Sequence, residues 1–455
     1  MVVLALAGCG GAMHHASAPP APKHVRHLAT LRPAKLVVTV VDGNRNTRVR
    51  GATVRLSHRA ARTNARGEAT IRVPGRKSMY VTVGAPGYGT RTLFEPFSGH
   101  RLVTVRIYRP RLQWRMYGAT PGRSQAQVHI HLRPPFKTVW YVPLGGLVEF
   151  PAVVDDGVAY VGNRSGTVYA ISMRRGRVLW RHRTNATMAS SLAVFGTELV
   201  HHSMNGRVSL LDRADGSVRW SYSVGSPIES SPIVRGGVDY FGTWDGRVIA
   251  LDLRRHRVRW TRRLGEKITA SASFAGGRLF IGDYGGRIWA LSPRTGATRW
   301  VRSVNGRVYG TSAVAQGRVF VPSSTGGSLT AFSTGGRYLW RIDTGSYVYS
   351  SPAVWSGRVF FGSYNGVFYA VSAASGRTLW RVGAGGPISG AAVVVGGVAY
   401  AGSFAGRIVG VSAKSGHVVL NFRHGHYVPV SGDGMHLLLH GYSSLYAVEP
   451  VRSLK

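Results

Sequence analysis

The chain has 455 residues, more than a single hydrophobic core usually holds, so two or more domains are expected. It carries 58 Lys and Arg against 18 Asp and Glu, a formal net charge of +40, and its one cysteine excludes a disulfide within the chain. This charge indicates either an anionic partner, such as wall polymer, lipid or nucleic acid, or a compositional habit of the source genome. The arginines are scattered rather than grouped in blocks, which favours the compositional explanation, and nucleic acid is not expected as a partner.

Residues 1–9 end in Leu6-Ala7-Gly8-Cys9, which closes a small apolar run. The motif resembles a bacterial lipobox, in which the cysteine receives a diacylglyceryl group and becomes the new N-terminus. No basic segment precedes the run, which is short for a signal peptide, so we expect the true start to lie upstream. Lipidation of Cys9 would hold the protein on the outer face of the cytoplasmic membrane of a bacterium. The alternative is an accidental match in an apolar tail.

Residues 10–34 are rich in Ala, Pro, His and Ser and have no hydrophobic period, so they are predicted to form a flexible tether. From residue 35 to residue 109, short runs alternate apolar and polar residues between turn signals, which predicts five or more strands. The order VxVxD, GAxVxL, TxxxGxAxI, YxVxVxAxGY resembles the carboxypeptidase regulatory-like, or transthyretin-like, β-sandwich. The resemblance implies an accessory or spacer domain.

Residues 110–136 are predicted to be a lead-in linker. The pattern W-x-x-Y-G at Trp114–Gly118, followed by Pro134-Pro135-Phe136, resembles the segment that precedes the first blade in bacterial propellers with pyrroloquinoline-quinone-like repeats. We expect Trp114 to pack against the domain that follows.

A tryptophan recurs every forty residues over most of the remaining chain, at Trp140, Trp180, Trp220, Trp260, Trp300, Trp340 and Trp380, with Leu420 in the eighth place. Each unit holds four short β-branched and aromatic runs bounded by Gly, Ser or Asn, which predicts four strands, A to D, and no helix. A four-stranded unit of this length is typical of a β-propeller blade. A glycine stands four residues before the tryptophan phase at most C–D turns, and His256 is the exception.

Residues 137–450 are predicted to close into an eight-bladed propeller. Seven units are complete, whereas the last supplies only strands A to C, at 427–432, 435–441 and 443–450. Residues 137–142 have D-strand phase but precede any A strand, so they are expected to complete the eighth blade and remove its open edge. The fold class is therefore all-β, a propeller preceded by a small transthyretin-like β-sandwich.

The phrases VYAIS…RGRVLW, WALSPRTGATRW and YAVSAASGRTLW resemble the tryptophan-docking repeat of quinoprotein propellers, in which each tryptophan braces neighbouring blades. Quinoprotein dehydrogenases in that class carry adjacent cysteines against the quinone and bind Ca²⁺ through carboxylate and amide oxygens. Here the only cysteine lies in the lipobox, and the acidic residues do not cluster in sequence. The histidine pairs His201-His202 and His424/His426 do not offer the three or four ligands that zinc needs. We therefore expect no metal, no cofactor and no enzyme activity.

One repeat phase varies from blade to blade, unlike most others. One residue after the aliphatic position that opens strand A, the eight units carry Glu149, Ala189, Glu229, Thr269, Tyr309, Tyr349, Ser389 and Pro429. Because strand A is innermost in a propeller, these side chains are predicted to ring one mouth of the central channel. The B–C connections are predicted to add an aromatic-rich rim of Arg164, Trp244, Asp283, Tyr284, Tyr364, Phe404 and Tyr442. The alternative is that these positions vary because they are exposed and unconstrained.

The sequence thus predicts a non-enzymatic, lipid-anchored, extracytoplasmic scaffold that binds protein partners through a propeller face. A lipid-anchored propeller with these repeats resembles the BamB-like lipoproteins, a likeness that implies a scaffold in an outer-membrane assembly machinery. A pyrroloquinoline-quinone-dependent oxidoreductase and attachment to an anionic wall polymer remain the alternatives.

Overall fold

The computed structural model describes residues 34–73, 79–95 and 101–451. Cys9 and most of the predicted tether lie outside these residues. Apart from the short 3-10 turn η1 (Pro110–Leu112), every regular element in the described ranges is a strand, so the all-β prediction is confirmed. Within the same ranges, no helix is long and apolar enough to span a bilayer.

The first domain consists of two four-stranded sheets. In one sheet, β1 (Ala34–Asp42) lies between β5 (Glu68–Val73) and β8 (Arg101–Ile107), with β2 (Thr47–Arg48) at its end. The other sheet has the order β4 (Arg59–Arg62), β3 (Thr53–Leu56), β6 (Met79–Gly84), β7 (Arg91–Glu95). The alternating residues of the strands meet in one buried core between the sheets, as in β5, where Ala69, Ile71 and Val73 are buried and Thr70 and Arg72 are exposed. The likeness to a carboxypeptidase regulatory domain stays a prediction.

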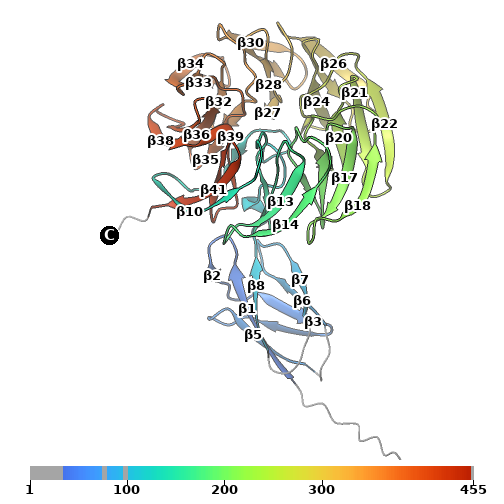
Figure 1. The fold of residues 1–455 in the computed structure, drawn as a ribbon, viewed down its shortest axis with the longest axis vertical. Coiled ribbons are helices and arrows are strands. Elements are labelled where there is room, and N and C mark those ends of the chain that lie inside the picture. The colour runs from blue at the N-terminus through green and yellow to red at the C-terminus, as the bar shows by residue number, and fades with distance from the viewer. Residues whose placement is uncertain (1–33, 74–78, 96–100, 452–455) are drawn as a thin grey trace, which may run out of the picture.

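The second domain is a ring of eight sheets, each with four antiparallel blade strands, which is consistent with the predicted number of blades (Figure 1). The sheet of blade 7 has a fifth, parallel strand from the lead-in segment. Blade 1 contains β11 (Val153–Asp155), β12 (Val158–Gly162), β13 (Thr167–Ser172) and β14 (Val178–Arg183), and blade 2 contains β15 (Ala193–Phe195), β16 (Glu198–His202), β17 (Arg207–Asp212) and β18 (Val218–Ser223). Blade 3 contains β19 (Ile233–Arg235), β20 (Val238–Gly242), β21 (Arg247–Asp252) and β22 (Arg257–Arg263), and blade 4 contains β23 (Ser273–Ala275), β24 (Arg278–Gly282), β25 (Arg287–Leu291) and β26 (Thr298–Ser303). Blade 5 contains β27 (Ala313–Ala315), β28 (Arg318–Ser323), β29 (Ser328–Ser333) and β30 (Tyr338–Asp343). Blade 6 contains β31 (Ala353–Trp355), β32 (Arg358–Gly362), β33 (Val367–Ser372) and β34 (Thr378–Gly383). Blade 7 contains β35 (Val393–Val395), β36 (Val398–Ser403), β37 (Arg407–Ser412) and β38 (Val418–Arg423). Buried clusters fill the seams between neighbouring blades, so the hydrophobic core is divided among the seams.

Blade 8 joins the two ends of the propeller. It contains β39 (Gly425–Gly432), β40 (Leu437–Gly441) and β41 (Ser444–Pro450), and β10 (Phe136–Pro143) is its outer strand. β10 runs antiparallel to β41, from Phe136 opposite Pro450 to Pro143 opposite Ser444. The N-terminal segment therefore supplies the strand that the C-terminal segment lacks, as predicted.

The recurring tryptophan of each outer strand contacts the C–D turn of the next blade. Six of the indole N–H groups donate to a backbone carbonyl of that turn at 2.8–3.3 Å: Trp140 to Met173, Trp180 to Arg213, Trp260 to Pro293, Trp300 to Thr334, Trp340 to Ala373 and Trp380 to Ala413. The glycine of the same turn lies against the ring: a Cβ added at Gly296 would lie 2.7 Å from Trp260. At the exception, His256 stacks on Trp220 with ring centroids 4.5 Å apart.

Leu420 stands where this contact has no counterpart. It lies in the outer strand of blade 7, so its neighbour is blade 8. The C and D strands of blade 8 come from opposite ends of the chain, so no C–D turn joins them. A tryptophan at this place would have no turn to contact, which accounts for the break in the pattern.

Hydroxyl groups at a second repeat phase link successive inner strands. The backbone N–H of Ser191 donates to the Ser231 hydroxyl at 3.0 Å, and the same bond repeats from Ser231 to Ser271, Ser271 to Thr311 and Thr311 to Ser351. Each bond spans one period of 40 residues. These bonds fix the inner edges of blades 2 to 6 around the channel.

The sandwich contacts the A–B hairpins of blades 1 and 8. Tyr108 lies so close to Gly157 of blade 1 that a Cβ there would meet its phenol oxygen at 2.1 Å. The Asn44 side-chain amide donates to the backbone carbonyl of Asp433 of blade 8 at 2.5 Å, and its own oxygen accepts from the N–H of Arg109. The domain therefore sits at the edge of the ring, beside the junction of the chain ends (Figure 1).

Candidate functional site

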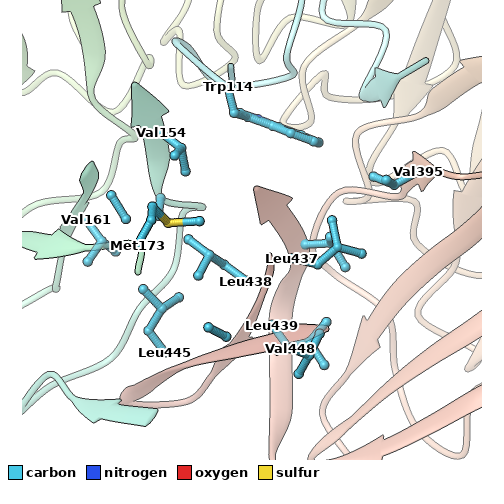
Figure 2. Close-up of a cluster of buried hydrophobic side chains, with 14 of the residues drawn as sticks. Trp114, Val154, Val161, Met173, Val395, Leu437, Leu438, Leu439, Leu445 and Val448 are labelled. Atoms are coloured by element: carbon cyan, nitrogen blue, oxygen red, sulfur yellow. The ribbon is translucent and has the colours of Figure 1, made fainter. Parts of the chain in front are cut away.

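The lead-in segment closes one end of the central channel. Residues 114–127 run across the inner strands: Trp114 bridges Val154 of blade 1, Met116 bridges Ala193 of blade 2, and β9 (Ala126–Gln127) pairs with β35 of blade 7. In between, the carbonyls of Pro121, Gly122 and Ser124 accept from Phe274, Val314 and Val354 of blades 4, 5 and 6. Figure 2 shows Trp114 in the cluster that contains Val154, Val395 of blade 7 and Leu437 and Leu438 of blade 8. This segment is a plug, and the predicted packing of Trp114 is confirmed.

Arg123 fastens the plug from within. Its guanidinium is fully buried and donates only to backbone carbonyls: Nε to Ala272 at 3.0 Å, Nη2 to Ser231 and Pro232 at 3.1 and 2.9 Å, and Nη1 to Tyr117. Burial lowers the pKa of Arg123 to about 10, so the group keeps its charge at neutral pH. One side chain thus ties the plug to the inner edges of blades 3 and 4.

The opposite mouth is open and forms a small pocket. Of the predicted ring, Glu149, Glu229, Thr269, Tyr309, Tyr349 and Ser389 line it, and Tyr117 of the plug lines it as well. These residues lie in the D–A connections, just before each inner strand, at the end of the channel away from the A–B hairpins. The cavity measures about 60 Å³, space for roughly four water molecules. The pocket is therefore a recess rather than a channel.

The Glu229 carboxylate lines the pocket and accepts two hydrogen bonds from side chains. It accepts from the Tyr309 hydroxyl at 2.8 Å and from the Trp244 indole N–H at 3.1 Å. Tyr309 reaches it from the entry of blade 5, whereas Glu229 and Trp244 belong to blade 3. Burial, and then the charge of Glu229, raise the pKa of Tyr309 far above its usual range, so the phenol stays protonated and donating.

Glu149 is the second carboxylate of the pocket. Burial raises its pKa, opposed by Arg164, whose guanidinium donates to it at 2.8 Å, and assisted by the charge of Glu229. Glu149 therefore has a cationic partner on the rim. Glu149 and Glu229 thus line one mouth, as the ring prediction placed them, with different partners for each acid.

A continuous arc of aromatic rings borders the mouth on blades 4 to 8. We call this set the mouth arc; neighbouring centroids lie 5.2–6.4 Å apart along Tyr284, Tyr309, Tyr349, Tyr364, Phe404, His426 and Tyr442. Tyr347 and Tyr427 pack beside it. On the blade 3 side, the Lys267 ammonium lies 3.3 Å from the centroid of the Trp244 ring and 5.1 Å from that of Tyr284. The predicted rim residues Trp244, Tyr284, Tyr364, Phe404 and Tyr442 thus lie around one opening.

Three residues of the predicted set lie elsewhere. Ala189 is buried and does not line the pocket, and Pro429 is buried within β39, where Tyr427 lines the pocket instead. Asp283 is fully buried and accepts from Arg287 and Trp289 at 3.0 and 2.8 Å, so it supports its own turn.

Apart from Tyr117 of the plug and His426, the mouth residues that the sequence analysis missed share a phase two positions earlier. That phase holds Leu147, Thr187, Pro227, Lys267, Arg307, Tyr347, Pro387 and Tyr427, which vary as much as the predicted ring. Lys267, Tyr347 and Tyr427 border the mouth, and Arg307 lies over Tyr284 at 5.6 Å. The variation at this second phase was a signal available in the sequence.

The donor set does not suit a Ca²⁺-bound quinone. No group of three or more His, Cys, Asp or Glu that could hold a metal ion occurs in the part of the chain that the structure describes. The cavity of about 60 Å³ is well below the 300 Å³ or more that is typical of cofactor pockets. His202, from one of the histidine pairs, is buried between the Ser230 carbonyl and the Asp239 carboxylate, where it braces blade 3 against blade 2.

Three comparisons place the chain among known proteins. The sequence profile of the family described as outer membrane protein assembly factor BamB matches in four overlapping stretches, 111–271, 164–313, 246–335 and 306–423. No curated protein sequence matches.

Several solved structures share the fold. BamB from Moraxella catarrhalis superposes with a TM-score of 0.60 at 19% identity, over 69% of this chain and 99% of that one. The quinohemoprotein alcohol dehydrogenase from Comamonas testosteroni gives 0.63 at 14%, over 74% and 80%. A europium-containing methanol dehydrogenase gives 0.63 at 12%, over 74% and 98%. At these identities the likeness shows the propeller fold alone.

Proposed function

Because the chain belongs to the family of the outer membrane protein assembly factor BamB, whose profile matches it between residues 111 and 423, we propose that it is a non-enzymatic scaffold that binds a protein partner. The binding surface is the open mouth of the propeller. The observation that carries the proposal is the mouth arc, because a continuous border of tyrosines and other aromatic residues is the composition that protein interfaces favour. The short connections and the plug leave a broad, shallow face, which suits a protein better than a small substrate.

The proposal includes an extracytoplasmic location on a bacterial membrane, through a lipid on Cys9. The family name describes assembly of outer membrane proteins, and we expect this chain to depart from the family in its Arg-rich composition and its added sandwich. The sandwich of β1 to β8 lies outside the matched residues, and its place between Cys9 and the propeller suits a spacer.

A pyrroloquinoline-quinone-dependent oxidoreductase is the second candidate, favoured by the likeness to two dehydrogenases. It would be supported if the protein, reconstituted with the quinone and Ca²⁺, acquired the absorbance of a bound quinone. Attachment to an anionic wall polymer through the basic surface is the third candidate, and salt-sensitive retention on purified wall polymer would support it.

The test replaces exposed rings of the mouth. Tyr347→Ala with Tyr364→Ala removes two of them, and Tyr338→Ala is the matched control, since Tyr338 is 58% exposed on the outer strand β30. A photo-crosslinker at position 404 identifies the partner in cell envelopes, and binding is then measured with purified proteins. We expect the double variant to weaken binding by about 2 kcal/mol or more, roughly 30-fold, with an unchanged melting temperature. Equal binding by the double variant and wild type would refute the mouth as the partner surface.

A further inference from the structure

Glu229 is a buried carboxylate that has no cationic partner in the described residues. It is 9% exposed, and its hydrogen bonds come from two neutral groups, the Tyr309 hydroxyl and the Trp244 indole. Some other buried acids of the propeller hold an arginine: Asp252 pairs with Arg259 at 2.8 Å, and Asp155 with Arg213 at 2.9 Å. The buried Asp433 also lacks a cation in the described residues, but it accepts from backbone N–H groups of its own A–B turn. Glu229 differs from Asp433 because its carboxylate lines an open pocket, where a ligand can supply the missing cation.

The acceptors around Glu229 point to a ligand that donates hydrogen bonds. The Thr269 hydroxyl lines the same pocket, is 5% exposed and makes no hydrogen bond of normal geometry among the described residues. Its neighbour is the Tyr284 phenol; burial raises the pKa of that phenol, and Thr269 opposes the rise. Glu149, two blades away from Glu229, lines the same pocket. Glu149 already accepts from Arg164, and Glu229 accepts from two neutral donors, so the recess offers the remaining lone pairs of two carboxylates together with the Thr269 hydroxyl.

The walls of the recess are suited to a cation. Tyr309 and Tyr349 line it with ring centroids 5.6 Å apart, and the faces of aromatic rings attract an ammonium group. The protein already shows this interaction at the rim, where the Lys267 ammonium lies over Trp244. The cations at the mouth are already engaged: Lys267 and Arg307 lie over aromatic rings, and Arg164 is paired with Glu149.

We propose that the mouth pocket binds one primary ammonium group, with Glu229 as its counter-ion and the Thr269 hydroxyl as an additional acceptor. The cavity of about 60 Å³ admits an ammonium head and little more, which favours a group on a thin alkyl chain. The inference rests on the proposed function, because the source it favours is a lysine side chain that a protein partner inserts into the recess inside the mouth arc. A free alkylamine has the same chemistry and is distinguished by the experiment.

The test measures binding of defined probes to the full chain by saturation-transfer NMR. The probes are n-butylammonium, its neutral analogue n-butanol, the peptide Gly-Gly-Lys-Gly-Gly and the same peptide with norleucine in place of lysine. We expect both ammonium probes to bind and both neutral probes to fail. Non-specific attraction does not explain such binding, since the protein carries a large positive charge.

Two variants assign the binding to the pocket. Glu229→Gln keeps the size of the side chain and removes its charge, and we expect it to weaken both ammonium probes at least 10-fold. Asp215→Asn removes the same charge from an exposed C–D turn and should leave binding unchanged. Lys267→Met should strengthen binding about twofold, because it removes a like charge from the rim.

Equal affinity of wild type and Glu229→Gln would overturn the proposal, and so would equal binding of the lysine and norleucine peptides to wild type. The second comparison needs no variant and holds even if Glu229→Gln fails to fold. Binding of n-butylammonium without the lysine peptide would keep the ammonium site and identify a free amine as its ligand. Because no partner is used, a negative result here leaves the Tyr347/Tyr364 test of the scaffold function intact.

Discussion

Most C–D turns carry glycine because the tryptophan of the preceding blade packs directly against the turn. At Gly296 and its equivalents, the ring of the preceding blade occupies the space of a side chain, and the backbone φ is positive as well. Among the C–D turns that contact a tryptophan, His256 is the one residue at this position that is not glycine. Its flat ring stacks on Trp220, and its backbone adopts a φ of 55°. The turn residue and the tryptophan, 36 residues apart in sequence as in Trp260 and Gly296, thus form one contact.

Gly296→Ala should destabilise the protein more than Gly317→Ala. The two glycines have φ of 71° and 72°, but an added Cβ meets Trp260 at Gly296 and nothing within 4 Å at Gly317. Gly317→Ala should cost about 1 kcal/mol from backbone strain alone, and Gly296→Ala about 1–3 kcal/mol more from the displaced ring. Urea unfolding measures both. Equal costs would show that the ring adapts freely and that the tryptophan does not brace the seam.

Two buried histidines make the protein less stable in mild acid. Burial lowers the pKa of His201 to about 3 and that of His440 to about 4. Between pH 6.5 and about 4 the unfolded chain binds protons that the folded chain does not, so the free energy of unfolding falls by about 1.4 kcal/mol per pH unit for each histidine. Asp433, whose pKa burial raises to about 6, acts in the opposite direction.

His201→Leu should therefore reduce the loss of stability in acid. Neither ring nitrogen of His201 has a hydrogen-bond partner, so leucine removes the proton site without leaving a donor or acceptor unpaired. The difference in unfolding free energy between pH 6.5 and 4.5 should shrink by about 2–3 kcal/mol relative to wild type. His417→Leu, at an exposed position, is the control. An unchanged pH dependence in His201→Leu would mean that this ring titrates normally.

At the scale of strands, the regular forty-residue repeat made the fold predictable, whereas the segments that depart from the repeat were not predicted from it. The forty-residue phase placed Glu149, Glu229 and Tyr309 correctly because each D–A connection repeats the same geometry. It failed at Pro429, where β39 carries an irregularity between Gly425 and Val430 that changes the register. Beyond the packing of Trp114, the path of the plug was not predicted, because its contacts with many blades use backbone groups and the non-repeating Arg123.

The strand β10 can be tested apart from the plug. A chain of residues 144–455 lacks both and leaves β41 as an open edge, so it should melt lower and aggregate more readily than a chain of residues 111–455. Adding a separate segment of residues 128–143 restores β10 without the plug, including the stacking of Tyr141 on Tyr446 and the Lys137–Glu449 ion pair. It should recover much of the lost stability. If 144–455 melts like 111–455, the strand does not hold the ring closed.

At the scale of the whole molecule, the two ends of the channel have different neighbours. The sandwich contacts A–B hairpins through Tyr108 and Asn44, the plug crosses the inner strands, and the mouth arc lies among the D–A and B–C connections. The sandwich follows Cys9 in the chain, so a lipid on Cys9 would tether the protein from the side of the molecule that the mouth does not use. The partner surface would then remain free of the membrane.

Cys9→Ser tests the lipid anchor, and the positive charge of the protein makes salt washes a necessary part of the test. Expressed with a complete signal, wild type should stay with the membrane, since two acyl chains suffice for stable anchoring, whereas Cys9→Ser should be released. A net charge of +40 could also hold the variant on anionic lipid headgroups. Membranes are therefore washed at low salt and at about 1 M salt, where the Debye length falls to about 3 Å. We expect salt to release Cys9→Ser and leave wild type bound. Release of both would assign retention to charge, and retention of both would place the anchor elsewhere than on Cys9.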